Sequence, residues 1–189
     1  MKDLTMGDIT HNLRHEHRVI ERALRALDGM CVRIEVGDNV PHESIAELFG
    51  FLSNFGDSFH HGKEEKYLFP ALLREGVAQR GGATDTLARE HDLERRLITE
   101  LGSVVESYGQ DKPESRAAFV KTARQYVDLM VEHFQKEDRA LFRIANDFLD
   151  EPAKQDLSRQ FMEAEAELGA EPRQAYERLA ADLESKWAY

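Results

Sequence analysis

Two histidine–glutamate pairs in this sequence have the spacing of metal ligands on a helix. Glu64 follows His60 by four residues, and Glu137 follows His133 by four residues. Residues four apart lie on the same helical face, one turn from each other. Imidazole and carboxylate ligands together suit iron, zinc, manganese or copper, and they do not suit calcium or magnesium. The pairs therefore predict a transition-metal site on two helices.

Two further histidines interrupt apolar stripes with helical periodicity. The first stripe comprises Leu13, His17, Ile20, Leu24 and Leu27. The second comprises Leu87, His91, Glu94, Ile98, Leu101 and Val105. A single histidine on such a stripe is more often an ordinary core residue than a ligand. Four inward histidines with two inward glutamates need a cationic partner, because buried charge is costly and these stripes contain no lysine or arginine.

An internal repeat indicates how these residues meet. The pattern H-x-x-K-E-[ED]-x-x-L-F begins at His60 and again at His133, and Glu16-His17 is repeated as Glu90-His91. Two helical hairpins related by a pseudo-twofold axis would bring both sets together. Each of two metals would then take two histidines, with the glutamates as bridges, and positions would remain open for a bridging oxide or hydroxide and for a small molecule.

The elements that must position these residues are long helices separated by turn signals. We expect four of them, at about 9–36, 42–75, 83–109 and 113–150, with Pro70 kinking or breaking the second. Gly81-Gly82 and Gly109 mark the ends of the third. Two shorter helices are expected at about 153–168 and 172–187. The prediction is an all-α chain with an up-down-up-down four-helix bundle over residues 1–150. Residues 151–189 are a C-terminal helical extension that packs on the bundle or on a partner subunit, so a homo-oligomer is one expectation.

Composition narrows the function. The chain has 189 residues and a net charge of −11, which argues against nucleic acid and against anionic lipid as partners. No apolar run is long enough to span a membrane, and the first residues lack the apolar core of a signal peptide. One cysteine, Cys31, excludes an internal disulfide. We therefore expect a cytoplasmic protein.

With these motifs in place, the chain resembles the hemerythrin-like (HHE cation-binding) family over about residues 9–147. The segments that carry the resemblance are Glu16–Ile20, His60–Pro70, Glu90–Asp92 and His133–Phe142. The resemblance implies two iron ions, bridged by oxide or hydroxide, as the cofactor. It implies the following iron ligands: His17, His60, Glu64, His91, His133 and Glu137.

The chain departs from the oxygen-carrying hemerythrins, which have a fifth histidine one turn after the third-helix histidine. Arg95 occupies that position here, and the last carboxylate is Glu137, four residues after its histidine, instead of an aspartate at five. Open positions on both irons are then expected. The predicted function is binding or sensing of O2, NO or H2O2 at a carboxylate-bridged di-iron centre. The alternatives are an enzyme that decomposes peroxide or NO, and an iron storage or delivery protein.

Several other residues compete for a role. His61 shares a polar face with Asp57 and Glu65, so it is expected to be exposed and not to bind metal. Glu94 lies on the second stripe and is either an additional ligand or a hydrogen-bond partner. Tyr67 and Tyr126 flank the predicted site, as core residues or as hydrogen-bonding residues. His11 and His15 lie off the stripe and are expected at the surface.

Overall fold

The protein is helical throughout its described part. The computed structural model describes residues 9–77, 82–108 and 113–189, and within these ranges it contains helices and no strand. The prediction of an all-α chain is confirmed. Among the described residues, no helix combines the length and the apolar character that a membrane span requires. The predicted turn residues Gly81 and Gly109 lie outside the described ranges.

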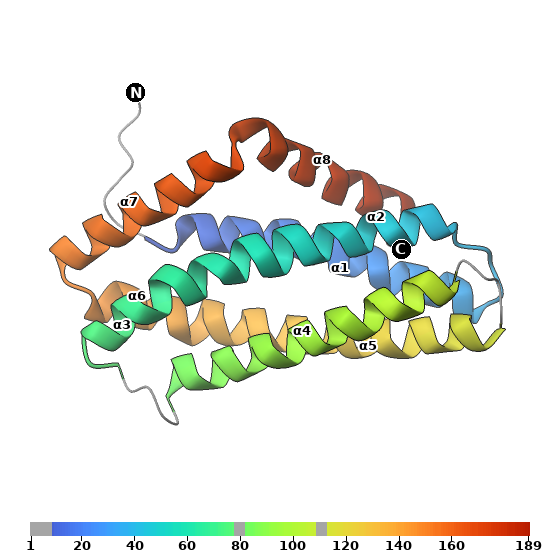
Figure 1. Ribbon diagram of the computed structural model, residues 1–189, viewed down its shortest axis with the longest axis horizontal. Helices are drawn as coiled ribbons and strands as arrows, with labels where there is room; N and C mark the ends of the chain where they lie inside the picture. Colours follow the sequence, from blue (N-terminus) through green and yellow to red (C-terminus); the bar gives the residue numbers. More distant parts are fainter. Residues whose placement is uncertain (1–8, 78–81, 109–112) are drawn as a thin grey trace.

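Four long helical rods lie side by side (Figure 1). The first rod is α1, His11–Glu35, and the third is α4, Ala83–Tyr108. The second rod is continuous and consists of α2 (His42–Phe51), the π-helical segments η1 (Leu52–His61) and η2 (Glu64–Leu68), and α3 (Phe69–Arg74). The fourth rod consists of α5 (Pro113–Lys136), the π-helical segment η3 (Glu137–Leu141) and α6 (Phe142–Phe148).

Of the two effects expected of Pro70, a kink or a break, the break does not occur, because the second rod continues through this residue. The π turn η2 directly precedes Pro70. The equivalent π turn η3 occurs in the fourth rod, where Arg143 stands in place of a proline. Both π turns begin at a glutamate of the predicted site. Proline is therefore not the cause of the wide turn, and π turns are frequent at functional sites.

The core has two apolar parts with a polar layer between them. One part contains Ile20 of α1 and Ile98 of α4. The other contains Leu13 of α1 and Leu87 of α4. On α1, His17 lies between Leu13 and Ile20, and the other predicted ligands divide their helices in the same way. The candidate site is thus enclosed along the rods by tightly packed apolar side chains.

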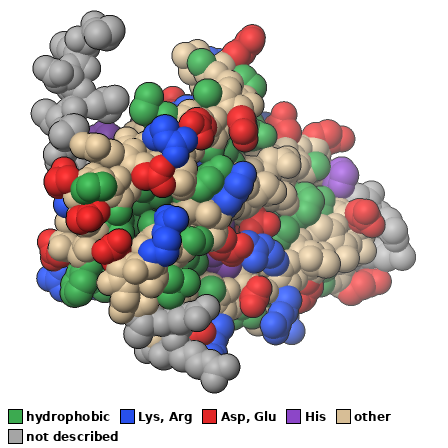
Figure 2. All heavy atoms as spheres, turned by 60° about the vertical axis from the view of Figure 1, so that its left-hand side comes forward, with side chains coloured by type: hydrophobic (Ala, Val, Ile, Leu, Met, Phe, Trp, Pro, Cys, Tyr) green, Lys and Arg blue, Asp and Glu red, His purple; other side chains and the backbone are tan. Residues whose placement is uncertain are grey.

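The C-terminal extension forms two helices over the first two rods. These are α7, Glu151–Leu168, and α8, Ala170–Trp187, close to the predicted limits. Asp150 caps α7 by accepting a hydrogen bond from the N–H of Ala153 at 2.8 Å, and Gly169 separates the helices with a φ of 88°. α8 packs along α1 of the same chain, and α7 approaches η2 (Figure 1). On the face drawn in Figure 2, acidic and basic side chains are interspersed.

Gly29 provides a test of the contact between α1 and α8. A Cβ atom at Gly29 would overlap the backbone carbonyl of Trp187, whereas a Cβ at Gly50 of α2 would meet nothing within 4 Å. We expect Gly29→Ala to lower the free energy of unfolding by about 1–3 kcal/mol, as overpacking does. Gly50→Ala should raise it by up to about 1 kcal/mol through helix propensity. Urea denaturation of both variants measures this, and an unchanged Gly29→Ala would contradict the close packing.

Candidate metal centre

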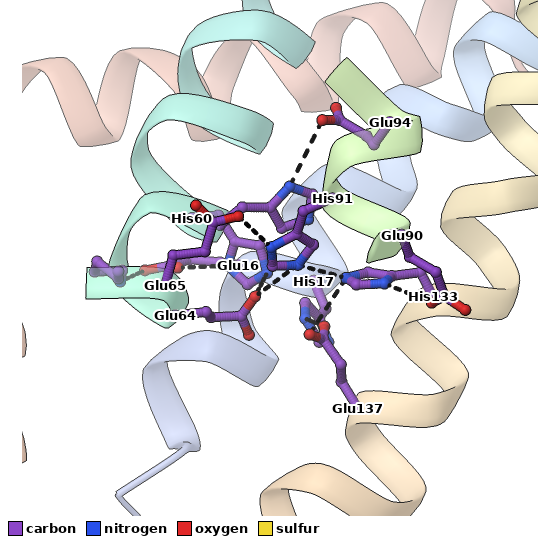
Figure 3. Close-up of polar contacts among 12 residues, drawn as sticks. Glu16, His17, His60, Glu64, Glu65, Glu90, His91, Glu94, His133 and Glu137 are labelled. Atoms are coloured by element: carbon purple, nitrogen blue, oxygen red, sulfur yellow. Dashed lines mark hydrogen bonds and ion pairs between the residues drawn. The ribbon is translucent and has the colours of Figure 1, made fainter. Parts of the chain in front are cut away.

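The six predicted ligands come from all four rods and meet in the polar layer. Each has a side chain that is no more than 1% exposed, which makes this a fully buried cluster. His17 comes from α1 and His91 from α4, while the two histidine–glutamate pairs come from the second and fourth rods. Figure 3 shows these side chains pointing toward one another.

The ligand atoms form two groups that are linked by the glutamates. In each group the candidate ligand atoms lie within 4.8 Å of one another. The groups are His17, His60, Glu64 and Glu137, and His61, Glu64, His91 and His133.

Each glutamate reaches a histidine of both groups. The Oε2 atom of Glu64 lies 4.0 Å from Nε2 of His60 and 3.6 Å from Nε2 of His91. Glu137 lies 3.1 Å from Nε2 of His17 through Oε2 and 3.2 Å from Nε2 of His133 through Oε1. A carboxylate between two ligand groups has the arrangement of a bridge between two metal ions. The geometry therefore suits two cations that share Glu64 and Glu137.

His61 belongs to this cluster, and the expectation that it is exposed is wrong. Its side chain is fully buried, and its ring stacks on that of His91 with centroids 4.1 Å apart. His91 and His133 bring their Nε2 atoms to 3.1 Å from each other, so the three rings converge on one place. The structure thus supplies a fifth histidine from the second rod. Arg95, at the position where oxygen carriers have theirs, is directed to Asp57 and Glu65 instead.

His60 and His61 are adjacent, and both face inward. They end the π-helical segment η1, whose buried residues include both histidines. The π turn is not required for this, because His133 and Phe134, at the same places in the repeat, are both buried on the α-helix α5. Neighbouring residues of a helix point about 100° apart, and a buried face of that width accommodates two of them. The helical spacing of His61 from Asp57 and Glu65 therefore did not determine its burial.

A carboxylate holds the outer nitrogen of four of these histidines. Nδ1 of His60 lies 2.9 Å from Glu16, and Nδ1 of His133 lies 3.0 Å from Glu90. In the same way Nδ1 of His91 is 2.7 Å from Glu65 and Nδ1 of His17 is 3.1 Å from Asp138. Such contacts favour the tautomer with a proton on Nδ1, which leaves the Nε2 lone pair free for a metal. The rings are therefore oriented for ligation by residues outside the predicted ligand set.

The repeat in the sequence accounts for these partners, although their role was not predicted. Glu16 and Glu90, which precede the first histidine of each half, each reach across to the second histidine of the same half. The lysine of the repeated motif secures that glutamate: Lys63 lies 2.5 Å from Glu16, and Lys136 lies 2.5 Å from Glu90. Lys63 is a buried cation that the apolar stripes did not reveal, but it is directed to Glu16.

Aromatic rings follow the same pseudo-twofold relation. Phe142 stacks against His17 and Phe69 stacks against His91, with centroids 5.2 and 5.5 Å apart. His17 also stacks on Phe134, and His91 stacks on His61. The ring centroids are 4.1 Å apart in both pairs. Phe134 is thus the counterpart of His61. One half of the site has three histidines where the other has two histidines and a phenylalanine.

The electrostatics of the cluster favour a bound cation. Burial and the nearby Glu137 raise the pKa of Glu64 well above its ordinary value. Burial alone would lower the pKa of His133, but Glu137 and Glu90 outweigh it and raise that pKa to about 9. Protons therefore compensate the charge when no metal does. Several ligand atoms are buried without a hydrogen-bond partner: both oxygens of Glu64 and of Glu137, and Nε2 of His17, His60 and His61. Nitrogen and oxygen atoms with free lone pairs in such a cluster fit metal ions.

The other residues considered from the sequence lie outside the two ligand groups. Tyr126 is buried and donates a hydrogen bond to Glu94 at 3.0 Å, and burial raises the pKa of Glu94 to about 8. Tyr67 packs against Phe161 of α7. His15, in the off-stripe pair, contacts Glu177 of α8 at 3.0 Å, outside the cluster.

The chain belongs to the hemerythrin HHE cation-binding domain family, whose model matches residues 8–145. Similar curated proteins from Mycobacterium tuberculosis and Mycobacterium bovis are described only as uncharacterized. They are 24% identical over 155 residues, which covers 82% of this chain. The chain spans about 60% of the length of these relatives. No solved structure matches the chain.

Replacement of His61 tests its place in the centre. We expect His61→Ala to lower the metal content per chain as strongly as His60→Ala, because both rings lie in the buried ligand groups. His11→Ala is the matched control, since His11 is exposed at the start of α1, and its metal content should equal that of the wild type. Elemental analysis after metal loading gives the result. Full metal content in His61→Ala would restrict the ligand histidines to four.

Proton release tests the charge compensation. His133, with its pKa near 9, carries a proton near neutral pH in the metal-free protein, and the raised pKa of Glu64 favours the protonated form of that carboxyl group. Ligation displaces such protons. Metal uptake in weak buffer near neutral pH should therefore acidify the solution, and affinity should increase as the pH rises toward about 9. Above that pH, His133 should no longer contribute to the pH dependence of the affinity. Calorimetry in buffers of different ionisation enthalpy measures the released protons, and uptake without proton release would contradict this account.

Proposed function

We propose that this protein holds two iron ions in the buried cluster and binds a small ligand of the O2, NO or peroxide type there. The observation that carries the proposal is the set of five histidines and two glutamates in two linked groups. When bound, such an iron pair supplies redox chemistry toward oxygen and nitrogen oxides. The chain's own residues fix the ligand positions, exclude water and keep the histidine nitrogens directed inward.

The unequal division of histidines supports an open coordination position on one side of the cluster. Counting both glutamates as bridges, the metal beside His61, His91 and His133 would receive five protein ligands. The metal beside His17 and His60 would receive four. A shared oxide or hydroxide would bring the first to six ligands and would leave the second with one vacant position. The sequence predicted vacancies on both irons, and the buried His61 supports a single vacancy instead.

The alternatives differ in what happens to the ligand and to the metal. Storage or delivery requires iron to leave, and seven buried protein ligands oppose frequent release. An enzyme that decomposes peroxide or NO would use the same vacancy, so it differs from a binding or sensing protein only by turnover.

The pseudo-twofold relation offers a sharp test of the vacancy. Phe134 stacks on His17 as His61 stacks on His91, so Phe134→His would place an imidazole where the second metal lacks one. We expect the wild type to bind two irons and to form an azide complex in its oxidised state. Phe134→His should keep both irons and bind azide at least about tenfold more weakly, since an added ligand competes for the vacancy.

Phe134→Leu is the control, because it stays apolar and cannot ligate, and it should still bind azide. Iron analysis and absorbance titration with azide provide the measurements, and steady consumption of peroxide would show turnover. A wild type that holds a single metal ion would contradict the paired centre. Equal azide affinity in all three proteins would contradict the assigned vacancy.

A further inference from the structure

A second group of metal-binding side chains adjoins the centre on its outer side. Asp57, His61 and Glu94 bring candidate ligand atoms within 4.8 Å of one another. His61 is shared with the centre, whereas Asp57 and Glu94 belong to neither ligand group. The three residues come from η1 and α4, which lie next to each other.

The outer nitrogen of His61 distinguishes it from the other four histidines of the centre. Those four have a carboxylate within 3.1 Å of Nδ1. Nδ1 of His61 is 3.9 Å from Oε2 of Glu94, which is too long for a hydrogen bond. Both ring nitrogens of His61 and Oε2 of Glu94 are buried without a hydrogen-bond partner. The separation instead suits an ion between them, because metal–nitrogen and metal–oxygen bonds are about 2.0–2.2 Å long.

Exposure falls from the surface toward the centre along this group. The side chain of Asp57 is 19% exposed, that of Glu94 is 1% exposed, and that of His61 is fully buried. An ion that reaches Asp57 from solvent would therefore meet Glu94 and His61 before it meets the centre.

The local charge also favours a divalent cation. Asp57, Glu65 and Glu94 are acidic, and Arg95 compensates for one of them by contacts to Asp57 at 3.0 Å and Glu65 at 2.6 Å. Two negative charges remain when the carboxyl groups are ionised and the histidines neutral. Arg95 is bonded to Oδ1 of Asp57 and leaves Oε2 of Glu94 free to bind an ion. Imidazole with two carboxylates suits Fe²⁺, as well as Zn²⁺ and Mn²⁺.

We infer that Asp57, His61 and Glu94 form a loading site that binds a divalent metal ion on its way to the centre. This inference rests on the proposed function, because the centre is the destination. A neutral imidazole has one lone pair, so His61 serves one ion at a time. During loading Nδ1 binds the ion and Nε2 carries the proton. In the loaded centre Nε2 would bind the metal, one proton would leave Nε2 for solvent and one would come from solvent to Nδ1, so the ring would stay neutral.

Uptake kinetics test the loading site with the full-length metal-free protein. Co²⁺ serves as the probe, and stopped-flow absorbance follows its entry under a large excess of metal. We expect Asp57→Asn and Glu94→Gln each to slow uptake about tenfold or more, comparable to the loss of a supporting carboxylate at a metal site. Both variants should still reach the wild-type content of two ions, because neither residue belongs to the centre.

Asp92→Asn is the matched control. Asp92 is 67% exposed, lies on the same helix as Glu94 and also contacts Arg95, so the variant removes an equal charge from the same surface. Its uptake should keep the wild-type rate. Wild-type rates in Asp57→Asn and Glu94→Gln would overturn the inference. Equal slowing in Asp92→Asn would also overturn it, because it would show a general effect of charge. Weaker final binding in Glu94→Gln with an unchanged rate would overturn it too, because it would show that Glu94 only orients His61. A wild type that does not reach two ions would instead contradict the proposed centre, whatever the rates.

Discussion

The structure depends on the cost of enclosing two carboxylates in an apolar bundle. Glu64 and Glu137 are fully buried, and the proximity of Glu137 raises the pKa of Glu64, so they cannot both be ionised cheaply without a cation. The buried Lys63 does not remove this cost, because it is directed to Glu16. Instead, five imidazoles lie in the same place. The simplest explanation of this arrangement is that folding prepares a buried set of ligand atoms for cations.

An outer set of charged residues contacts the histidines and orients their rings. Glu16 and Glu90 hold the histidines of the second and fourth rods, and each glutamate is held in turn by a lysine. The lysine of the repeat thus holds the glutamate that orients a histidine. The acidic residues after the predicted ligand glutamates, Glu65 and Asp138, contact His91 and His17 in the same way. The motif H-x-x-K-E-[ED] describes ligands together with the groups that orient them. The repeat was therefore informative beyond the ligands, although sequence alone could not assign a partner to each charge.

Much of the fold and of the cluster could be predicted from the sequence, and the failure within the cluster concerns His61. Apolar periodicity predicts the helices, and the six predicted ligands lie in one layer. A turn of 100° per residue puts His61 beside Asp57 and Glu65, which predicts an exposed side chain. The inward face is nevertheless wide enough for two neighbouring residues, because His133 and Phe134 of α5 are both buried as well. A periodic pattern indicates the middle of a buried face and not its width.

One difference between the two halves of the repeat gives the cluster its asymmetry. A perfectly repeated chain would place equal ligand sets in both halves. Here the second rod contributes His61 where the fourth contributes Phe134, and both rings stack on the neighbouring helix's histidine at 4.1 Å. In the proposed centre, one metal position would thus gain a ligand and the other an apolar wall. Because His61 also adjoins Asp57 and Glu94, the proposed loading site lies on the histidine-rich side, while the proposed vacancy lies beside Phe134 and Phe142. A single difference between the two halves would therefore separate the side on which metal enters from the side on which a small ligand binds.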